Sequence, residues 1–300
     1  MVDGKTRILG VIGDPIEHTF SPAMHNAGLN ELGLNYIYLP FHVKEDMLGE
    51  CILGAKAMGI KGLNVTIPHK TNVIKHLDDI DSVALMIGAV NTIQFNFNEN
   101  NESSNQDNEI NVRTKGFNTD GYGCVRAIKE KTSINNKKVT ITGAGGAARA
   151  VAFLCAEKGA KKVYLLNRSI EKAQAVAAEV NRAFAGEVIC PMIISDYQKL
   201  PEEKLLAIQC TSVGLHPDTD RAVIEDEVFY QKIHTGYDLI YKPAETKFMK
   251  YVTKNGGRAY NGLKMLLYQG IIAYELWNDV TVSADIAEEI YGILKDRVAV

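Results

Sequence analysis

Two short segments carry the side chains best suited to chemistry, residues 64–70 (Asn-Val-Thr-Ile-Pro-His-Lys) and residues 116–121 (Gly-Phe-Asn-Thr-Asp-Gly). Each contains a titratable group, Lys70 or Asp120, that follows neutral side chains able to donate and accept hydrogen bonds. Another polar pair, Asn-Thr at residues 91–92, lies between them. Amides and hydroxyls suit the hydroxyl groups of a small molecule, while an ammonium and a carboxylate can manage a proton. This mixture predicts a pocket for a compact, polyhydroxylated substrate.

A glycine-rich turn follows the strand predicted at residues 138–142. In this pattern Gly143 permits the tight turn, Gly145 lets a phosphate approach the backbone, and Ala148 keeps helix and strand close. Glycines also form plain strand–helix turns, so the strand before and the helix after carry the prediction. The positive end of that helix would face the phosphates. The expected dinucleotide-binding residues here are Gly143, Ala144, Gly145, Gly146 and Ala147.

The next predicted strand, residues 163–167, ends on side chains that indicate the kind of nicotinamide cofactor. An NAD site usually has Asp or Glu at this strand end to bind the ribose 2′-hydroxyl. Here Asn167 is followed by Arg168 and Ser169, with Lys172 four residues beyond Arg168. A guanidinium binds a 2′-phosphate, which a carboxylate would repel. The segment therefore predicts NADP, and the alternative is an ordinary surface arginine beside a helix cap.

Composition excludes several classes of protein. The chain has 300 residues, of which 46% are hydrophobic and 23% charged, so it can fold as one large or two ordinary domains. A formal charge of −3 without a basic block argues against nucleic-acid binding. The five cysteines are scattered, as is typical of reduced thiols in a cytoplasmic protein. The sequence lacks a zinc-type histidine spacing, an apolar run of membrane-spanning length and a signal-peptide core, so we expect no metal and no membrane.

Apolar runs typical of strands alternate with helical patterns along most of the chain, which predicts an α/β fold rich in parallel strands. The predicted strands span residues 8–12, 36–43, 62–67, 91–97, 139–142, 163–167, 206–210 and 237–240. The predicted helices span residues 22–32, 45–58, 68–77, 147–157, 170–182 and much of 262–300. Pro68 would open the third helix, with Lys70 near its N-terminus. The polar residues 98–111 are predicted to be a solvated hairpin loop.

Several motifs in a fixed order resemble the shikimate dehydrogenase family over about residues 7–280. In the N-terminal part they are residues 18–26 (HTFSPAMHN), 62–70 (GLNVTIPHK), 88–92 (GAVNT) and 116–121 (GFNTDG). Further on they are residues 143–147 (GAGGA), 167–169 (NRS), 210–214 (CTSxG), 238–243 (DxxYxP) and 262–269 (GxxMLxxQ). A set of motifs in order is far more specific than any one of them.

The resemblance implies a two-domain α/β fold with the active site in the cleft. Residues 1–115 together with 262–300 would form the substrate-binding domain, and residues 116–261 the Rossmann domain that binds NADP. The implied activity is the reversible, NADPH-dependent reduction of 3-dehydroshikimate to shikimate in aromatic amino-acid biosynthesis. Both a monomer and a homodimer are compatible with the sequence.

The resemblance also assigns roles to individual residues. Lys70 and Asp120 would be the catalytic pair. The substrate would be held by Thr19, Ser21, Asn64, Thr66, Lys70, Asn91, Asp120, Tyr241 and Gln269. Thr211 and Gly262 would lie beside the nicotinamide, completing a cofactor site that also includes the glycine turn and residues Asn167, Arg168, Ser169 and Lys172.

Two positions depart from the family pattern. Thr19 stands where serine is more frequent, and its extra methyl bears on the acceptance of quinate. Lys172 stands where many NADP-dependent members have arginine, so a point charge replaces a planar fork.

Three rival interpretations remain. The nearest is a quinate/shikimate dehydrogenase that uses NAD, against which Arg168 argues. A nucleotide-binding regulator without catalysis would not need the set of Lys70, Asp120, Asn64, Asn91 and Gln269. A metabolite-binding structural module is the third.

Overall fold

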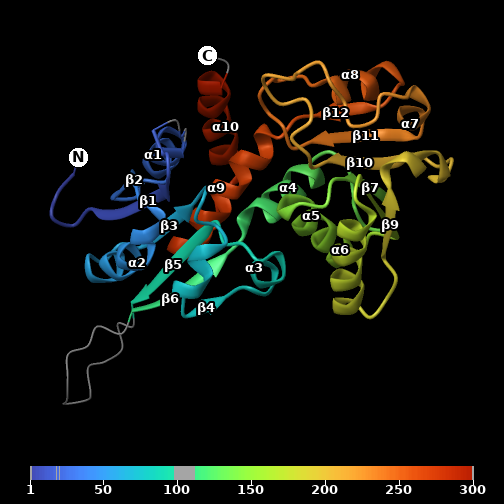
Figure 1. The fold of residues 1–300 in the computed structure, drawn as a ribbon. Coiled ribbons are helices and arrows are strands. Elements are labelled where there is room, and N and C mark those ends of the chain that lie inside the picture. Colours follow the sequence, from blue (N-terminus) through green and yellow to red (C-terminus); the bar gives the residue numbers. More distant parts are fainter. Residues whose placement is uncertain (1, 18, 20, 98–111, 299–300) are drawn as a thin grey trace. The chain divides into compact units, whose positions relative to one another are not determined.

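The computed structural model describes residues 2–17, 19, 21–97 and 112–298. The chain divides into two compact units, Met1–Thr119 with Gly270–Val300, and Asp120–Gln269 (Figure 1). The first unit is therefore discontinuous in sequence, and the second is one uninterrupted segment. The loop predicted at residues 98–111 lies outside the described residues.

The first unit is built on a six-stranded sheet with the strand order β2-β1-β3-β5-β6-β4. The strands are β1 (Arg7–Gly13), β2 (Tyr36–His42), β3 (Gly62–Val65), β4 (Asp79–Ile80), β5 (Thr92–Phe97) and β6 (Val112–Phe117). β1 lies parallel to β2 and β3, and β4 lies parallel to β6, while β5 is antiparallel to β3 and β6. This sheet is mixed, whereas the sequence favoured parallel pairing.

Helices cover both faces of this sheet. They are α1 (Ser21–Glu31), α2 (Leu48–Ala57), α3 (Ser82–Ile87), the C-terminal half of α9 (Leu263–Asn278) and α10 (Ala284–Val298), with 3₁₀ helices at Glu45–Met47 and Asn72–His76. On one face, Leu48 and Ile52 of α2 join the core with Leu63 of β3. On the other, Tyr274 and Trp277 of α9 pack with β1 and β2.

The prediction of a helix over residues 68–77 is wrong. Residues 68–71 form a turn, and only the short 3₁₀ helix Asn72–His76 follows. An α-helix would need the Lys70 carbonyl to accept from the amide four residues on, but here that carbonyl accepts from Val90 N at 2.8 Å. A long-range backbone hydrogen bond therefore replaces the helical one and fixes Lys70 to the segment before β5.

The second unit has a six-stranded, fully parallel sheet with the order β12-β11-β10-β7-β8-β9. The strands are β7 (Lys138–Thr142), β8 (Lys162–Asn167), β9 (Ile189–Ile193), β10 (Leu205–Gln209), β11 (Ile233–Asp238) and β12 (Arg258–Tyr260). This is the doubly wound order of a Rossmann domain, in which the strand order reverses between β7 and β10. Ligands of such sheets bind at the carboxyl ends of the strands at that reversal.

The helices of the second unit are α4 (Thr119–Lys129), which starts one residue before the unit does, α5 (Gly146–Glu157), α6 (Ile170–Ala183), α7 (Glu227–Gln231), α8 (Lys247–Lys254) and the first half of α9, with a 3₁₀ helix at Ile194–Lys199. The strands β9 and β12 were not predicted, and β11 begins at Ile233, before the predicted residue 237. Its first half carries His234, Thr235 and Gly236, which have none of the apolar character of a buried strand. Gly236 is required there because a Cβ atom would lie 2.8 Å from Val252 Cγ2 of α8.

Candidate active site

Two of the predicted substrate residues of the first unit, Asn64 and Asn91, lie together at the junction of β3 and β5. Asn64 of β3 is paired in register with Thr92 of β5. Its Nδ2 donates to Thr92 Oγ1 at 3.0 Å and to the Asn91 carbonyl oxygen at 3.2 Å. Asn64 is 8% exposed and Asn91 3%, so both amides are largely withdrawn from water.

Thr119, at the start of α4, joins this cluster. Its backbone N–H donates to Asn91 Oδ1 at 2.8 Å, and the Thr92 hydroxyl donates to the same oxygen at 3.1 Å. We call Asn64, Asn91, Thr92 and Thr119 the amide network. Thr92 and Thr119 were not predicted to be site residues, although each directly follows or precedes one that was. Their hydroxyls hydrogen-bond to the side-chain amides of Asn64 and Asn91 and hold them in place.

Lys70 and Asp120, the predicted catalytic pair, belong to different units. Lys70 is half-buried in the turn after β3, and its backbone is fixed by Val90. Asp120 is half-buried in the first turn of α4, where a carboxylate is favoured by the helix dipole. Thr66, also half-buried, is anchored by its N–H to the Ile12 carbonyl at 3.0 Å.

The hydroxyl pair Thr19 and Ser21 lies at the start of α1, and both residues are partly exposed. The Ser21 backbone N–H donates to Thr19 Oγ1 at 3.2 Å, which fixes the Thr19 side chain against the start of α1.

The glycine turn after β7 has the geometry that a pyrophosphate requires. Gly143 has φ +108°, a conformation that side-chain-bearing residues rarely adopt, and its N–H donates to the Leu166 carbonyl at 2.8 Å. Gly145 precedes α5, and a Cβ atom there would meet nothing within 4 Å. The first turn of α5 thus opens onto free space, where backbone N–H groups can receive a phosphate.

The loop after β10 lies against this turn, as expected at the reversal of strand order. A Cβ on Gly143 would be 3.1 Å from Thr211 Cγ2. Thr211 is itself held by its N–H, which donates to Gln209 Oε1 at 2.6 Å. The structure therefore brings Thr211 and the glycine turn together, and both fit a bound dinucleotide.

Arg168 and Lys172 are exposed beyond the end of β8, as a phosphate clamp requires. Asn167 Nδ2 donates to the Ser169 carbonyl at 2.9 Å and so shapes the turn that carries Arg168. Ser169 caps α6, and its hydroxyl donates to Glu171 Oε2 at 2.6 Å, which lowers the pKa of Glu171. Glu171 was not predicted to be near the cofactor site, yet it hydrogen-bonds to the Ser169 hydroxyl, which was assigned to the cofactor.

Asp238 at the end of β11 is the most deeply buried carboxylate near these loops. Its Oδ2 accepts from Thr246 Oγ1 at 2.6 Å, and its Oδ1 accepts from Ile240 N at 3.0 Å and Gln209 Nε2 at 3.3 Å. Burial raises the pKa of Asp238 to about 6. Asp238 thereby fixes the segment that carries Tyr241, whose own pKa is raised by burial. Asp238 is the first residue of the family motif at residues 238–243, but no role was predicted for it.

Two remaining predicted residues lie on α9 or just before it. Gly262 donates its N–H to the Ile240 carbonyl at 3.0 Å, and a Cβ there would lie 2.0 Å from the Leu239 oxygen, so only glycine fits. Gln269 is 9% exposed, and its Nε2 donates to the Leu266 carbonyl of its own helix at 3.0 Å. The amide nitrogen of Gln269 is therefore bonded within α9, while its amide oxygen can accept from another donor.

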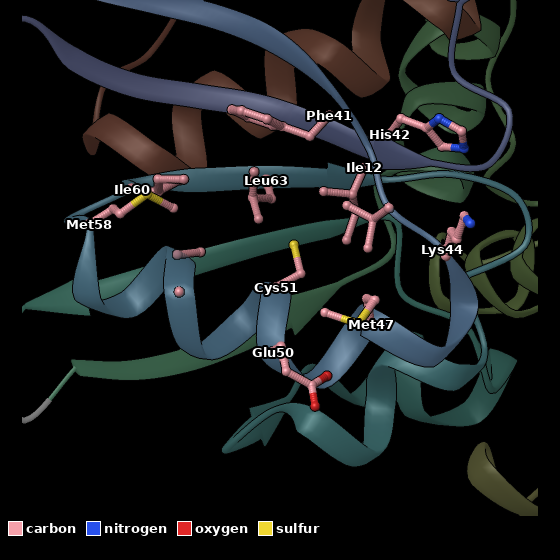
Figure 2. Close-up of a pocket in the computed structure, with 13 residues that line it drawn as sticks. Ile12, Phe41, His42, Lys44, Met47, Glu50, Cys51, Met58, Ile60 and Leu63 are labelled. Atoms are coloured by element: carbon pink, nitrogen blue, oxygen red, sulfur yellow. The ribbon is translucent and has the colours of Figure 1, made fainter.

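The first unit contains a pocket of about 590 Å³. Figure 2 shows it between α2 and the strands of the sheet, lined by Phe41, Cys51 and Leu63 among others. None of its lining residues is a predicted site residue. In the described part of the chain, no group of three His, Cys, Asp or Glu side chains is placed to hold a metal ion.

Comparison with known proteins extends over both units. The family model described as the shikimate dehydrogenase substrate binding domain matches residues 11–93, and the model described as shikimate / quinate 5-dehydrogenase matches residues 126–212. A relative from Methanobrevibacter smithii, named shikimate dehydrogenase (NADP(+)), is 40% identical over 96% of this chain and 97% of its own. Another with this name, from Methanococcus maripaludis, is 41% identical over 92% and 93%.

Solved structures give the same result. A shikimate dehydrogenase crystallised with NADP⁺ matches with a TM-score of 0.83 and 37% identity, over 99% of this chain and 98% of that one. Shikimate 5-dehydrogenase from Listeria monocytogenes, in complex with shikimate and NAD, matches with a TM-score of 0.83 and 32% identity over 96% and 97%. The two matched models, the full-length identity and the shared two-domain fold lead to one conclusion: this chain belongs to the shikimate dehydrogenase family.

Proposed function

We propose that this protein is an NADP-dependent oxidoreductase that interconverts 3-dehydroshikimate and shikimate, a step of aromatic amino-acid biosynthesis. The observation that carries the proposal is the 40% identity, over 96% of the chain, to a relative named for this activity. The amide network and the glycine turn support it, because they match the two kinds of ligand, a polyhydroxylated ring and a dinucleotide.

We assign the proton chemistry to Lys70 and Asp120. NADPH supplies a hydride when it is bound, and reduction of a carbonyl leaves negative charge on its oxygen. An ammonium at Lys70 can donate the proton that this oxygen needs. A carboxylate at Asp120 favours the charged ammonium in the forward direction. In the reverse direction the hydroxyl proton passes to the neutral amine of Lys70 or to the Asp120 carboxylate. The pair therefore serves both directions of one reversible reaction.

The remaining polar residues are assigned to holding the substrate. Thr19 and Ser21 offer two hydroxyls, side by side, to the substrate carboxylate. Asn64, Thr66, Asn91 and Gln269 are assigned to its hydroxyl groups, with Tyr241 beside the ring. These groups are neutral, so they orient the substrate without competing for the proton that Lys70 and Asp120 transfer.

The cofactor is assigned to the second unit. The pyrophosphate would lie on the N–H groups of residues 143–147, with Thr211 and Gly262 on the nicotinamide side. Arg168 would bind the 2′-phosphate through charge-assisted hydrogen bonds, with Asn167, Ser169 and Lys172 around it. The free Cys residues suit a reducing compartment, and we propose a cytoplasmic location. None of the helices in the described part of the chain has the length and hydrophobicity of a membrane span.

One experiment tests the proposal: initial rates for shikimate and quinate, each with NADP⁺ and NAD⁺, followed by the absorbance of the reduced nicotinamide. We expect the highest specificity constant for shikimate with NADP⁺. Absence of activity with all four combinations would contradict an enzymatic role and favour a nucleotide-binding regulator or a metabolite-binding module.

The second candidate is a quinate/shikimate dehydrogenase that prefers NAD, a cofactor found in the Listeria structure. Glu171, placed one turn from Arg168 and hydrogen-bonded to Ser169, is the observation that favours it. Higher activity with NAD⁺ than with NADP⁺, together with turnover of quinate, would select this candidate. Size-exclusion chromatography with light scattering would decide between the monomer and homodimer that we consider.

A further inference from the structure

Tyr38 of β2 is hydrogen-bonded to one of the proposed substrate residues, Asn64. It is fully buried, and its side chain reaches across β1 to Asn64 of β3. Tyr38 Oη donates to Asn64 Oδ1 at 2.7 Å. No family motif identified in the sequence includes Tyr38, which lies in an ordinary strand pattern.

The other partners of Asn64 determine which atom donates in its hydrogen bond with Tyr38. Both protons of Asn64 Nδ2 are used, since they point to the Asn91 carbonyl and to Thr92 Oγ1. If the amide were reversed, its oxygen would face a carbonyl oxygen that cannot donate. The Tyr38 hydroxyl therefore donates to Asn64 Oδ1, and the only capacity that Asn64 retains is one lone pair on that oxygen.

Asn91 has the opposite polarity. Its Oδ1 accepts from Thr119 N at 2.8 Å and from Thr92 Oγ1 at 3.1 Å, so both lone pairs are used. Among the described residues, no acceptor receives the protons of its Nδ2. Asn64 thus presents an acceptor and Asn91 presents donors, although the two side chains are chemically identical.

We propose that Tyr38 is a positioning residue that fixes this polarity, so that the amide pair binds one substrate hydroxyl, which donates to Asn64 and accepts from Asn91. The inference rests on the proposed function of this site. A hydroxyl satisfies both amides, whereas a carbonyl or a methyl ether has no proton for Asn64 Oδ1. The pair therefore selects a free secondary hydroxyl at the position it contacts.

The surroundings of Tyr38 keep its ring and its hydroxyl in place. His25, also fully buried, stacks on the Tyr38 ring with a centroid distance of 4.1 Å and an interplanar angle of 2°. Burial lowers the pKa of His25 to about 3 and raises that of Tyr38 well above its usual value. Both rings stay neutral at physiological pH, so Tyr38 retains the proton that it donates.

Tyr38→Phe tests the proposal, because phenylalanine keeps the ring and removes only the donor. We expect the KM for shikimate to rise about tenfold, with a smaller change in kcat and an unchanged KM for NADP⁺. Discrimination against shikimate analogues that lack one hydroxyl or carry it as a methyl ether should shrink in this variant for one position of the ring. An unchanged KM for shikimate would overturn the proposal.

Tyr274→Phe is the matched control. Tyr274 belongs to the same aromatic cluster and is fully buried, and its hydroxyl donates to the His25 carbonyl at 2.6 Å. We expect it to lower the thermal midpoint about as much as Tyr38→Phe but to leave the KM for shikimate unchanged. An equal rise in KM in both variants would mean that the cluster acts only through stability.

A second pair of variants tests the polarity even if Tyr38→Phe does not fold. Asn91→Asp and Asn64→Asp add the same charge, but only the first removes the donors proposed to face the substrate. Asn91→Asp should therefore raise the KM for shikimate more, and the reverse order would overturn the proposal. Failure of the proposed function is distinguishable, since the unmodified enzyme would then not oxidise shikimate at all.

Discussion

The amide network of the first unit and the glycine turn of the second differ in what shapes them: side-chain hydrogen bonds in the network, and missing side chains in the turn. In the network, buried side chains hydrogen-bond to one another, so that Asn64 is left with only an acceptor and Asn91 with only donors. In the turn, the absence of a side chain leaves free space beside the backbone, since a Cβ at Gly145 would meet nothing within 4 Å. The network should therefore be sensitive to changes of polarity at constant volume, and the turn to added volume at constant polarity.

Lys70→Ala should have the largest effect, because neither the network nor the turn supplies a proton. General acid–base groups contribute roughly 10²- to 10⁴-fold, so we expect kcat to fall by about that factor. The KM for shikimate should change little, since the main contact of Lys70 strengthens as charge develops on oxygen.

Asp120→Asn should act in the same direction, and the double variant should be far from additive, as measured by steady-state rates. A Lys70→Ala enzyme with near-normal turnover would remove Lys70 from the mechanism. Additive losses would mean that the two residues act separately.

The next prediction contrasts one carboxylate from each unit. Asp238 is buried among neutral donors and has its pKa raised to about 6, whereas Asp78, partly exposed beside Lys56, has its pKa lowered to about 2 by hydrogen bonds to Lys56 and Thr114. A raised pKa means that the folded state binds the proton more tightly, so stability from Asp238 is lost as pH rises from about 4 to 6.

Relative to Asp238→Asn, the unmodified protein should therefore lose about 3 kcal/mol of unfolding free energy between pH 4 and pH 7. Asp78 has the opposite sign, because its contribution is present above pH 4 and is lost as pH falls toward 2. Urea unfolding across this range measures both. A constant difference between the unmodified protein and Asp238→Asn would show that Asp238 is not protonated in this way.

Arg168→Ala tests whether a charged side chain adds to the cofactor binding proposed for the backbone of the glycine turn. It removes a charge-assisted contact worth roughly 1.5–3 kcal/mol, which corresponds to about ten- to a hundredfold weaker use of NADP(H). Use of NAD(H) should change little, and Lys172→Ala should have a smaller effect in the same direction. Equal losses for the two cofactors would mean that Arg168 supports the fold.

Thr19→Ser should have the smallest effect. The Thr19 methyl occupies space beside the predicted carboxylate site, where the additional tertiary hydroxyl of quinate would have to fit. Removing it should shift the ratio of specificity constants for shikimate over quinate by roughly 1 kcal/mol toward quinate. Ser21→Ala should instead weaken both substrates, because it removes a donor. An unmoved ratio in Thr19→Ser would show that this position does not set the choice.

Local patterns in the sequence predicted much of this fold, because strand and helix periodicity and the glycine turn depend on neighbours in the chain. The prediction failed where a distant partner decides the structure. The turn at Lys70 forms because its carbonyl binds Val90, and the polarity of Asn64 depends on Thr92 and Tyr38. These contacts arise from strand pairing, which the residues themselves do not encode locally. The assigned roles of Lys70, Asp120 and the cofactor residues remain predictions.

The division of the first unit into two sequence segments has a consequence for synthesis on the ribosome. The core around Leu9, Val11 and Tyr38 is completed by Ala273, Tyr274 and Trp277, close to the C-terminus. Residues 120–269 can fold as soon as they leave the exit tunnel, whereas one face of the first sheet waits for almost the whole chain. During translation that apolar face is exposed, so nascent chains arrested before residue 270 should bind chaperones more than chains released from the ribosome with residues 270–300 attached.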